Sequence, residues 1–102
     1  MDVAGEATLN WNPSAEEDLK GYRIYYGENP RTDDCPKGGY AEKVDVGKNT
    51  SYKINNLENG KTYYFSVTSY NNGGKESCFS EEMHKTISIN FFDKIKKIIL
   101  KK

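Results

Sequence analysis

Apolar and polar side chains alternate along most of this chain, which is the pattern of β-strands with one face in a core. The longest alternating run is residues 62–71, in which Tyr63, Phe65 and Val67 share one face. Turn-forming residues such as Asn-Pro and Asn-Gly-Gly separate this run from other stretches of the same character. Those stretches are residues 7–12, 21–27, 40–46, 51–56 and 76–89. Six or seven short strands spaced in this way predict an all-β, two-layer antiparallel sandwich in one domain.

The phase of the alternation also predicts which aromatic rings are buried. Trp11 falls in phase with the apolar residues of its strand, so we expect it in the core and not on a sugar-binding surface. In the segment GYRIYYG, the rings of Tyr22 and Tyr26 point inward and that of Tyr25 points outward. The following residues, 28–39, combine Pro, Gly and Asp and predict a long loop.

The last twelve residues, FFDKIKKIILKK, break the strand pattern. Their apolar side chains recur at helical spacing, with lysines on the other side. About three turns of helix are marginal alone, so we expect this tail to dock on an exposed edge of its own or a twin domain. Attachment to an anionic membrane surface, a partner interface and the start of a longer chain are the alternatives. The docking residues would be Phe91, Phe92, Ile95, Ile98 and Ile99.

The order and spacing of these motifs resemble a fibronectin type III domain, an immunoglobulin-like sandwich, over about residues 7–89. Trp11 in TLNW matches the buried tryptophan of the family's second strand, and YRIYY matches the inward residues of the third. The segment LENGKTY matches the tyrosine corner, in which the Tyr63 hydroxyl bonds back to the backbone. GGKESCFSEE is similar to the last hairpin of bacterial members.

The resemblance implies a function as well as a fold. It implies that residues 1–90 form a non-catalytic protein-interaction, adhesion or spacer module without a cofactor, and that residues 91–102 form a separate tail. It also implies an extracellular, periplasmic or cell-surface location. A carbohydrate-associated accessory module of a polysaccharide-degrading enzyme is the alternative. No apolar leader follows Met1, so the chain is either intracellular or a mature region.

Two features depart from the family pattern. Only residues 1–6 precede the Trp11 strand, so the usual first strand is absent or reduced to residues 2–4. The Trp11 strand would then be a sheet edge, part of the core beside it would lack cover, and self-association through this edge becomes an expectation.

The second departure is the pair Cys35 and Cys78, which is not a general family feature. A disulfide between them would close a 43-residue loop worth about 4 kcal/mol, and two unrelated thiols are the equal alternative. In the resembling fold these positions lie toward opposite ends. A bridge needs Cα atoms within ~7 Å, so the long loop would have to fold back across the sheet.

The predicted contact surface comprises outward tyrosines and two loops, residues 28–39 and 72–75. Cross-strand aromatic packing is the alternative explanation for the tyrosines. The candidate contact residues are Tyr25, Tyr64, Tyr70, Arg31, Asp33, Asp34, Asn72 and Lys75.

Other chemistries have little support in the sequence. The single histidine, His84, has no partner for a metal site, and the Asp33–Asp34 pair lacks calcium-loop spacing. No arrangement of acid, base and nucleophile predicts a catalytic site. Fifteen basic residues balance fifteen acidic ones, which argues against a nucleic-acid partner.

Overall fold

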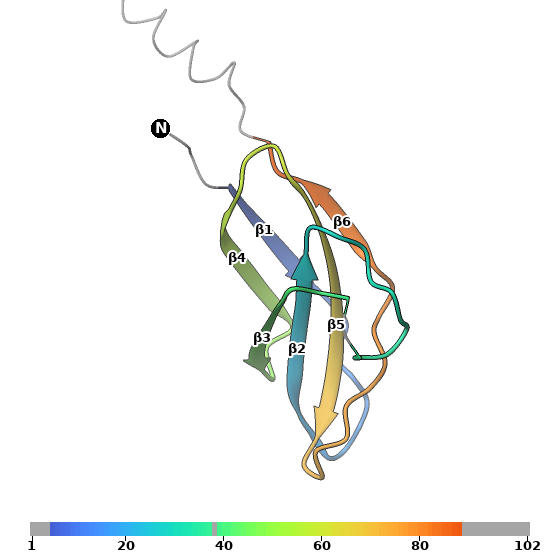
Figure 1. Cartoon of the computed structure of the whole chain (residues 1–102). Helices are drawn as coiled ribbons and strands as arrows, with labels where there is room; N and C mark the ends of the chain where they lie inside the picture. The colour runs from blue at the N-terminus through green and yellow to red at the C-terminus, as the bar shows by residue number, and fades with distance from the viewer. Residues whose placement is uncertain (1–4, 38, 89–102) are drawn as a thin grey trace, which may run out of the picture.

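The chain forms two antiparallel sheets packed face to face (Figure 1). The computed structural model describes residues 5–37 and 39–88. The larger sheet has the strand order β3-β2-β5-β6, and the smaller one pairs β1 with β4. Within the described residues the strands are β1 Gly5–Asn10, β2 Leu19–Gly27, β3 Glu42–Gly47, β4 Ser51–Leu57, β5 Thr62–Asn71 and β6 Met83–Thr86. The predicted sandwich is therefore confirmed.

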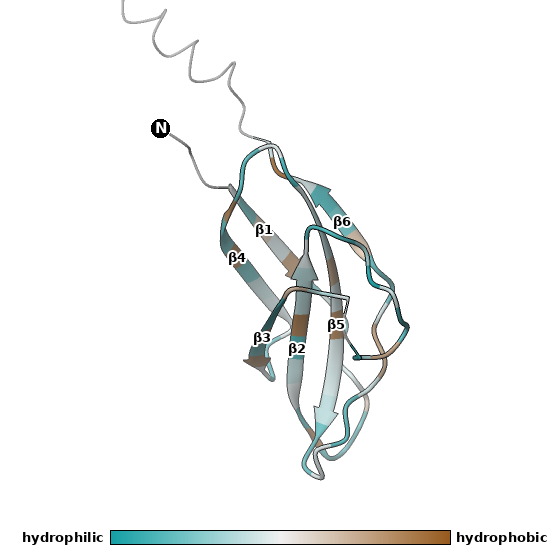
Figure 2. Cartoon of the chain, in the orientation of Figure 1, coloured by the Kyte–Doolittle hydropathy of each residue, from teal (hydrophilic) through white to brown (hydrophobic). Residues whose placement is uncertain are grey.

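The core lies between the two sheets and follows the predicted alternation. Figure 2 shows the apolar positions as brown bands on otherwise pale or teal strands. Trp11 is half-buried against this core, with its ring edge-on to Tyr22 at a centroid distance of 5.7 Å. Apolar burial of this kind is the main stabilising contribution to a small sandwich. The buried residues are Ala7, Tyr22, Ile24, Val46, Ile54, Leu57, Tyr63, Phe65 and Ile87.

The tyrosine corner is present as the motif predicts. The backbone N–H of Glu58 donates to the hydroxyl of Tyr63 at 2.9 Å, across the turn that begins β5. Gly60 has φ +89°, a conformation that glycine adopts without strain, so the turn needs glycine at this position. The corner fixes the approach of β4 to β5 and so the stacking of one sheet on the other.

The final strand is much shorter than predicted. The sequence pattern suggested residues 76–89, but only Met83–Thr86 pair regularly with β5. Before β6 the chain follows β5 irregularly, with the Ser77 amide bonded to Ser69 O at 2.8 Å and the Ser80 amide to Val67 O at 2.9 Å. The predicted irregularity around residues 77–80 is thus confirmed.

The beginning of β1 and the residues after β6 lie at the same end of the sandwich. A side chain added at Gly5 would collide with the side chain of Ile87, so only glycine permits this approach. The predicted boundary at residue 90 and the tail 91–102 lie outside the described residues. The described part of the chain contains no helix long and apolar enough to cross a membrane.

Candidate interaction surfaces

The loop between β2 and β3 folds back over the outer face of the larger sheet, where a disulfide holds it. Cys35 and Cys78 are bonded, with their Cα atoms 4.0 Å apart. The Phe79 amide also donates to Asp34 O at 2.8 Å. Figure 1 shows this loop crossing in front of the sheet. Of the two alternatives for the cysteines, a disulfide and two unrelated thiols, the disulfide is therefore correct. The loop folds back across the sheet, as this bridge requires.

Beneath the loop, three aromatic rings form a second packed layer. Phe79 lies edge-on to both Tyr25 and Tyr40, with centroid distances of 5.0 and 5.2 Å. Ser66 and Thr68, on the outward side of β5, are each only 1% exposed. The outward face of the sheet is consequently a covered surface over most of β5.

Charged side chains complete this layer. Arg31 donates from Nη1 to the hydroxyl of Ser66 at 3.0 Å, and its backbone N–H donates to a Glu82 carboxylate oxygen at 2.8 Å. The Tyr40 hydroxyl also donates to the Glu82 carboxylate. Burial in this layer, then the Glu82 bond, raises the pKa of Tyr40 to about 12.

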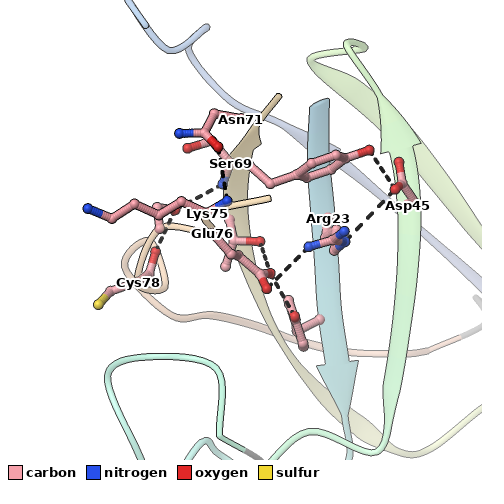
Figure 3. A network of polar contacts seen from close by, with 11 residues as sticks. Arg23, Asp45, Ser69, Asn71, Lys75, Glu76 and Cys78 are labelled. Atoms are coloured by element: carbon pink, nitrogen blue, oxygen red, sulfur yellow. Dashed lines mark hydrogen bonds and ion pairs between the residues drawn. The ribbon is translucent and has the colours of Figure 1, made fainter. Parts of the chain in front are cut away.

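A second polar network runs across β2, β3 and β5 around Glu76 (Figure 3). The Glu76 carboxylate accepts from the Tyr25 hydroxyl at 2.7 Å and from Thr68 Oγ1 at 2.6 Å. Arg23 Nη1 lies 3.2 Å from the same carboxylate. Burial and then the bond to Glu76 raise the pKa of Tyr25 to about 12. Glu76 therefore joins three side chains of the larger sheet.

Tyr70 closes the network on the side of β3. Its hydroxyl donates to Asp45 at 2.6 Å, and the Arg23 guanidinium lies over its ring at 4.0 Å. The hydrogen bond from Tyr70, followed by that from the Gly47 amide, lowers the pKa of Asp45. The same bond to Asp45 raises the pKa of Tyr70. The ring of Tyr70 lies on the outward face, as alternation predicts, but Arg23 and Asp45 cover it, so that it is only 7% exposed and offers little surface for contact.

The other predicted contact residues do not form one patch. Tyr64 is half-buried beside His84, and Arg31 is held in the layer just described. Asp33 and Asp34 are exposed on the disulfide-anchored loop. The exposed residues Asn72 and Lys75 belong to the hairpin that follows β5.

On the opposite side of β5 from this loop layer, the edge of β1 borders an open groove of about 750 Å³. Its floor includes Leu9, Trp11, Phe65 and Val67, and Met83 stands at its border with 63% of its surface exposed. We call this hollow the β1 groove; it is lined by residues 7–12, 65–67, 80–81 and 83–85. It lies beside Trp11, where the sequence predicts an uncovered strip of core.

The backbone of β1 has hydrogen-bonding groups on the groove side. Trp11 N donates to Thr50 O at 3.0 Å, so at Trp11 these groups face β4. Because the direction alternates along an antiparallel strand, Thr8 and Asn10 direct their N–H and C=O away from β4. β4 is the only strand paired with β1 in the described part of the chain. The predicted reduced first strand, residues 2–4, lies outside that part. At Glu6 the outward carbonyl accepts from Lys85 Nζ at 3.1 Å.

Sequence reasoning missed the residues that build the outer layer. Tyr40 and Phe79 are its central rings, and Glu76 and Glu82 supply its carboxylates. The sequence did contain one indication of this layer, the position of Phe79 next to Cys78. A disulfide that holds Cys78 against the loop also brings Phe79 against it. Within residues 5–37 and 39–88, no cluster of three or more His, Cys, Asp or Glu side chains is arranged to hold a metal ion.

Comparison with known proteins places this geometry in a recognised group. The sequence profile of the fibronectin type III domain matches residues 4–86. The curated Kelch domain-containing protein SSO1033 of Saccharolobus solfataricus is 39% identical over 70 residues, which cover 69% of this chain but only 8% of that protein.

Two solved structures share the fold. The FN1-FN3 domains of chicken CNTN1 superpose with a TM-score of 0.67 at 22% identity, covering 83% of this chain and 28% of that one. The third fibronectin III domain of the human KIAA0343 protein gives 0.63 at 21% identity, covering 82% of this chain and 71% of that one. At these identities the likeness concerns the fold alone.

Proposed function

Because the chain belongs to the fibronectin type III family, whose members are generally non-catalytic modules, we propose that it is a non-catalytic protein-interaction module of a larger secreted or cell-surface protein. The observation that carries this proposal is the loop between β2 and β3, which the Cys35–Cys78 disulfide holds on the sheet. The relative from S. solfataricus supports a multidomain context, since the match spans 8% of its length.

The anchored loop offers a contact surface with little remaining freedom. A disulfide and the Arg31 bonds to Ser66 and Glu82 fix its path, so a partner would pay little ordering entropy on binding. Its exposed carboxylates, Asp33 and Asp34, suit a partner with a basic surface.

The disulfide also supports the proposed location. Cys78 is exposed, so its bond is open to thiol exchange with cytosolic reductants. Disulfides that stabilise a fold persist in oxidising compartments, such as the cell exterior and the periplasm. An extracellular or periplasmic setting therefore fits this cross-link.

The carbohydrate-associated function receives no comparable support. Such modules stack sugars on exposed aromatic platforms, but the rings of Tyr25 and Tyr70 are engaged by Glu76, Asp45 and Arg23. Among the described residues, Tyr52 is the one aromatic side chain that is clearly exposed.

Chemical cross-linking to cell-envelope and culture-medium proteins of the source organism tests the proposal. We expect the oxidised protein to capture a defined partner, and D33S/D34S to lose it. The variant E42S/E81S removes the same charge from other exposed sites and should retain it. Equal capture by both variants would exclude the loop as the contact surface. Capture only by the reduced protein would contradict the proposed location.

A further inference from the structure

We propose that the β1 groove is the docking site for the chain's own residues 91–102, whose apolar side chains cover the half-buried floor beside Trp11. This inference is independent of the contact function assigned to the anchored loop. It rests on the groove, on where the described chain ends, and on the composition and charge of the segment that follows.

The groove offers an apolar surface that another segment can cover. Its floor of Leu9, Trp11, Phe65 and Val67 belongs to, or packs against, the core between the sheets. Met83, at its border, is the most exposed large hydrophobic side chain of the described residues. Exposed apolar patches next to an open strand edge favour association with another segment.

The chain leaves the sandwich at one end of this groove. Ile87 is buried beside Gly5, two residues beyond the groove-lining Lys85, so the segment after Ser88 begins where β1 begins. The six groove-lining residues 7–12 extend over about 20 Å at strand spacing. Twelve residues reach about 18 Å as a helix, so the tail can run along most of the groove.

Composition and charge favour this occupant over others. The tail carries Phe91, Phe92, Ile95, Ile98, Ile99 and Leu100 among its twelve residues. Its five lysines and one aspartate give +4, and since the whole chain is neutral, the first 90 residues carry −4. Opposite net charges attract the tail to the sandwich. A directly attached segment also has an effective concentration in the millimolar range, which a second copy does not reach at ordinary protein concentrations.

Trp11 is the only tryptophan of the chain and therefore reports on the groove without any label. In the full chain, F91S/I95S should increase acrylamide quenching of Trp11, shift its emission to longer wavelength and lower the Tm by roughly 4–8 °C. The matched variant K94S/K97S removes lysines instead and should leave Trp11 emission and quenching near those of the unchanged protein. Identical Trp11 behaviour in F91S/I95S and the unchanged chain would overturn the proposal.

A complementary experiment distinguishes docking of the chain's own tail from docking of a second copy of the chain. In the full-chain variant F91S/I95S, a synthetic peptide of residues 91–102 at millimolar concentration should reverse the exposed Trp11 signal. Protection that increases with protein concentration, together with dimers in sedimentation, would instead identify a second copy as the occupant and overturn docking within one chain. A Trp11 change in K94S/K97S that matches the change in F91S/I95S would also contradict the apolar cover.

Discussion

The two faces of the larger sheet are covered in different ways. On the outer side, a loop with little apolar character covers β2 and β5 through a disulfide, two charged networks and three aromatic rings. On the inner side, beside β1, part of the core opens into a groove. Specific bonds hold the outer cover in place. The β1 groove, in contrast, is covered only when another segment binds in it.

The difference has a physical cause. A long irregular loop loses conformational entropy when it lies on a sheet, and apolar burial must normally offset this loss. Here the cross-link restricts the loop in the unfolded chain as well, so fewer apolar contacts suffice. The β1 edge has no such tether among the described residues. We therefore expect perturbations of the outer cover to affect stability more than perturbations of the exposed polar residues at the β1 edge, which should mainly affect association.

The largest effect should come from removing the cross-link. The variant C35S/C78S is expected to lower the free energy of unfolding by about 4 kcal/mol, since the bond closes a 43-residue loop. Urea unfolding measures this loss. Amide exchange should increase at Ser66, which Arg31 of the loop contacts. The unchanged protein treated with reductant should match the variant, and equal stability with and without reductant would refute this account of the outer cover.

Removing the central carboxylate should have the next largest effect. Glu76→Ala leaves Tyr25, Thr68 and Arg23 without their shared partner and is expected to cost about 2–3 kcal/mol. Thermal unfolding of this variant and of Glu81→Ala compares the two sides directly. Glu81 is exposed at the β1 groove, and its loss should change stability by less than about 0.5 kcal/mol. Similar losses in both variants would remove the distinction between the sides.

Alkaline pH should weaken the outer cover by a smaller amount. Tyr25 and Tyr40 have pKa values raised from 10.0 to about 12 in the folded chain. Their contribution to stability is therefore complete below pH 10 and is lost as the pH rises toward 12. Unfolding midpoints across this interval should decline, and Y25F/Y40F should decline less steeply. If the unfolding midpoint of Y25F/Y40F declines with pH as steeply as that of the unchanged protein, these two hydroxyls are not the cause.

The smallest stability effect is expected at the β1 edge. Lys85→Ala removes the ammonium that bonds Glu6 O, but both residues are exposed, so stability should change by less than about 0.5 kcal/mol. The variant should instead self-associate more, because a lysine that blocks an edge is lost. Sedimentation at several concentrations measures this. A large loss of stability in Lys85→Ala without self-association would contradict the difference that we expect between the outer cover and the β1 edge.

The sequence was sufficient for features that depend on local periodicity. The buried positions of Tyr22 and Phe65 and the corner at Tyr63 follow from alternation and turn chemistry, and they were predicted correctly. These features need no knowledge of how distant loops run.

The outer layer could not be predicted in the same way. Alternation assigns Thr68 and Tyr70 to the outward face, but it does not indicate whether another segment covers that face. The cover comes from a loop without periodicity, and its path became apparent only from the Cys35–Cys78 bond. Tyr40 and Phe79 meet because of that path, although 39 positions separate them in the sequence. The contact residues were therefore the least accurate part of the sequence prediction.

The close approach of Gly5 to Ile87 has a consequence for how a host protein would carry this module. Because Gly5 and Ile87 lie side by side, the described chain begins and ends at one end of the sandwich, and a segment after Ser88 that docks in the β1 groove would turn back from that end. The 72–75 hairpin would form the distal tip, roughly 30 Å away along β5. A host that carried the module would therefore present this tip at the far end of the sandwich from both Gly5 and Ile87.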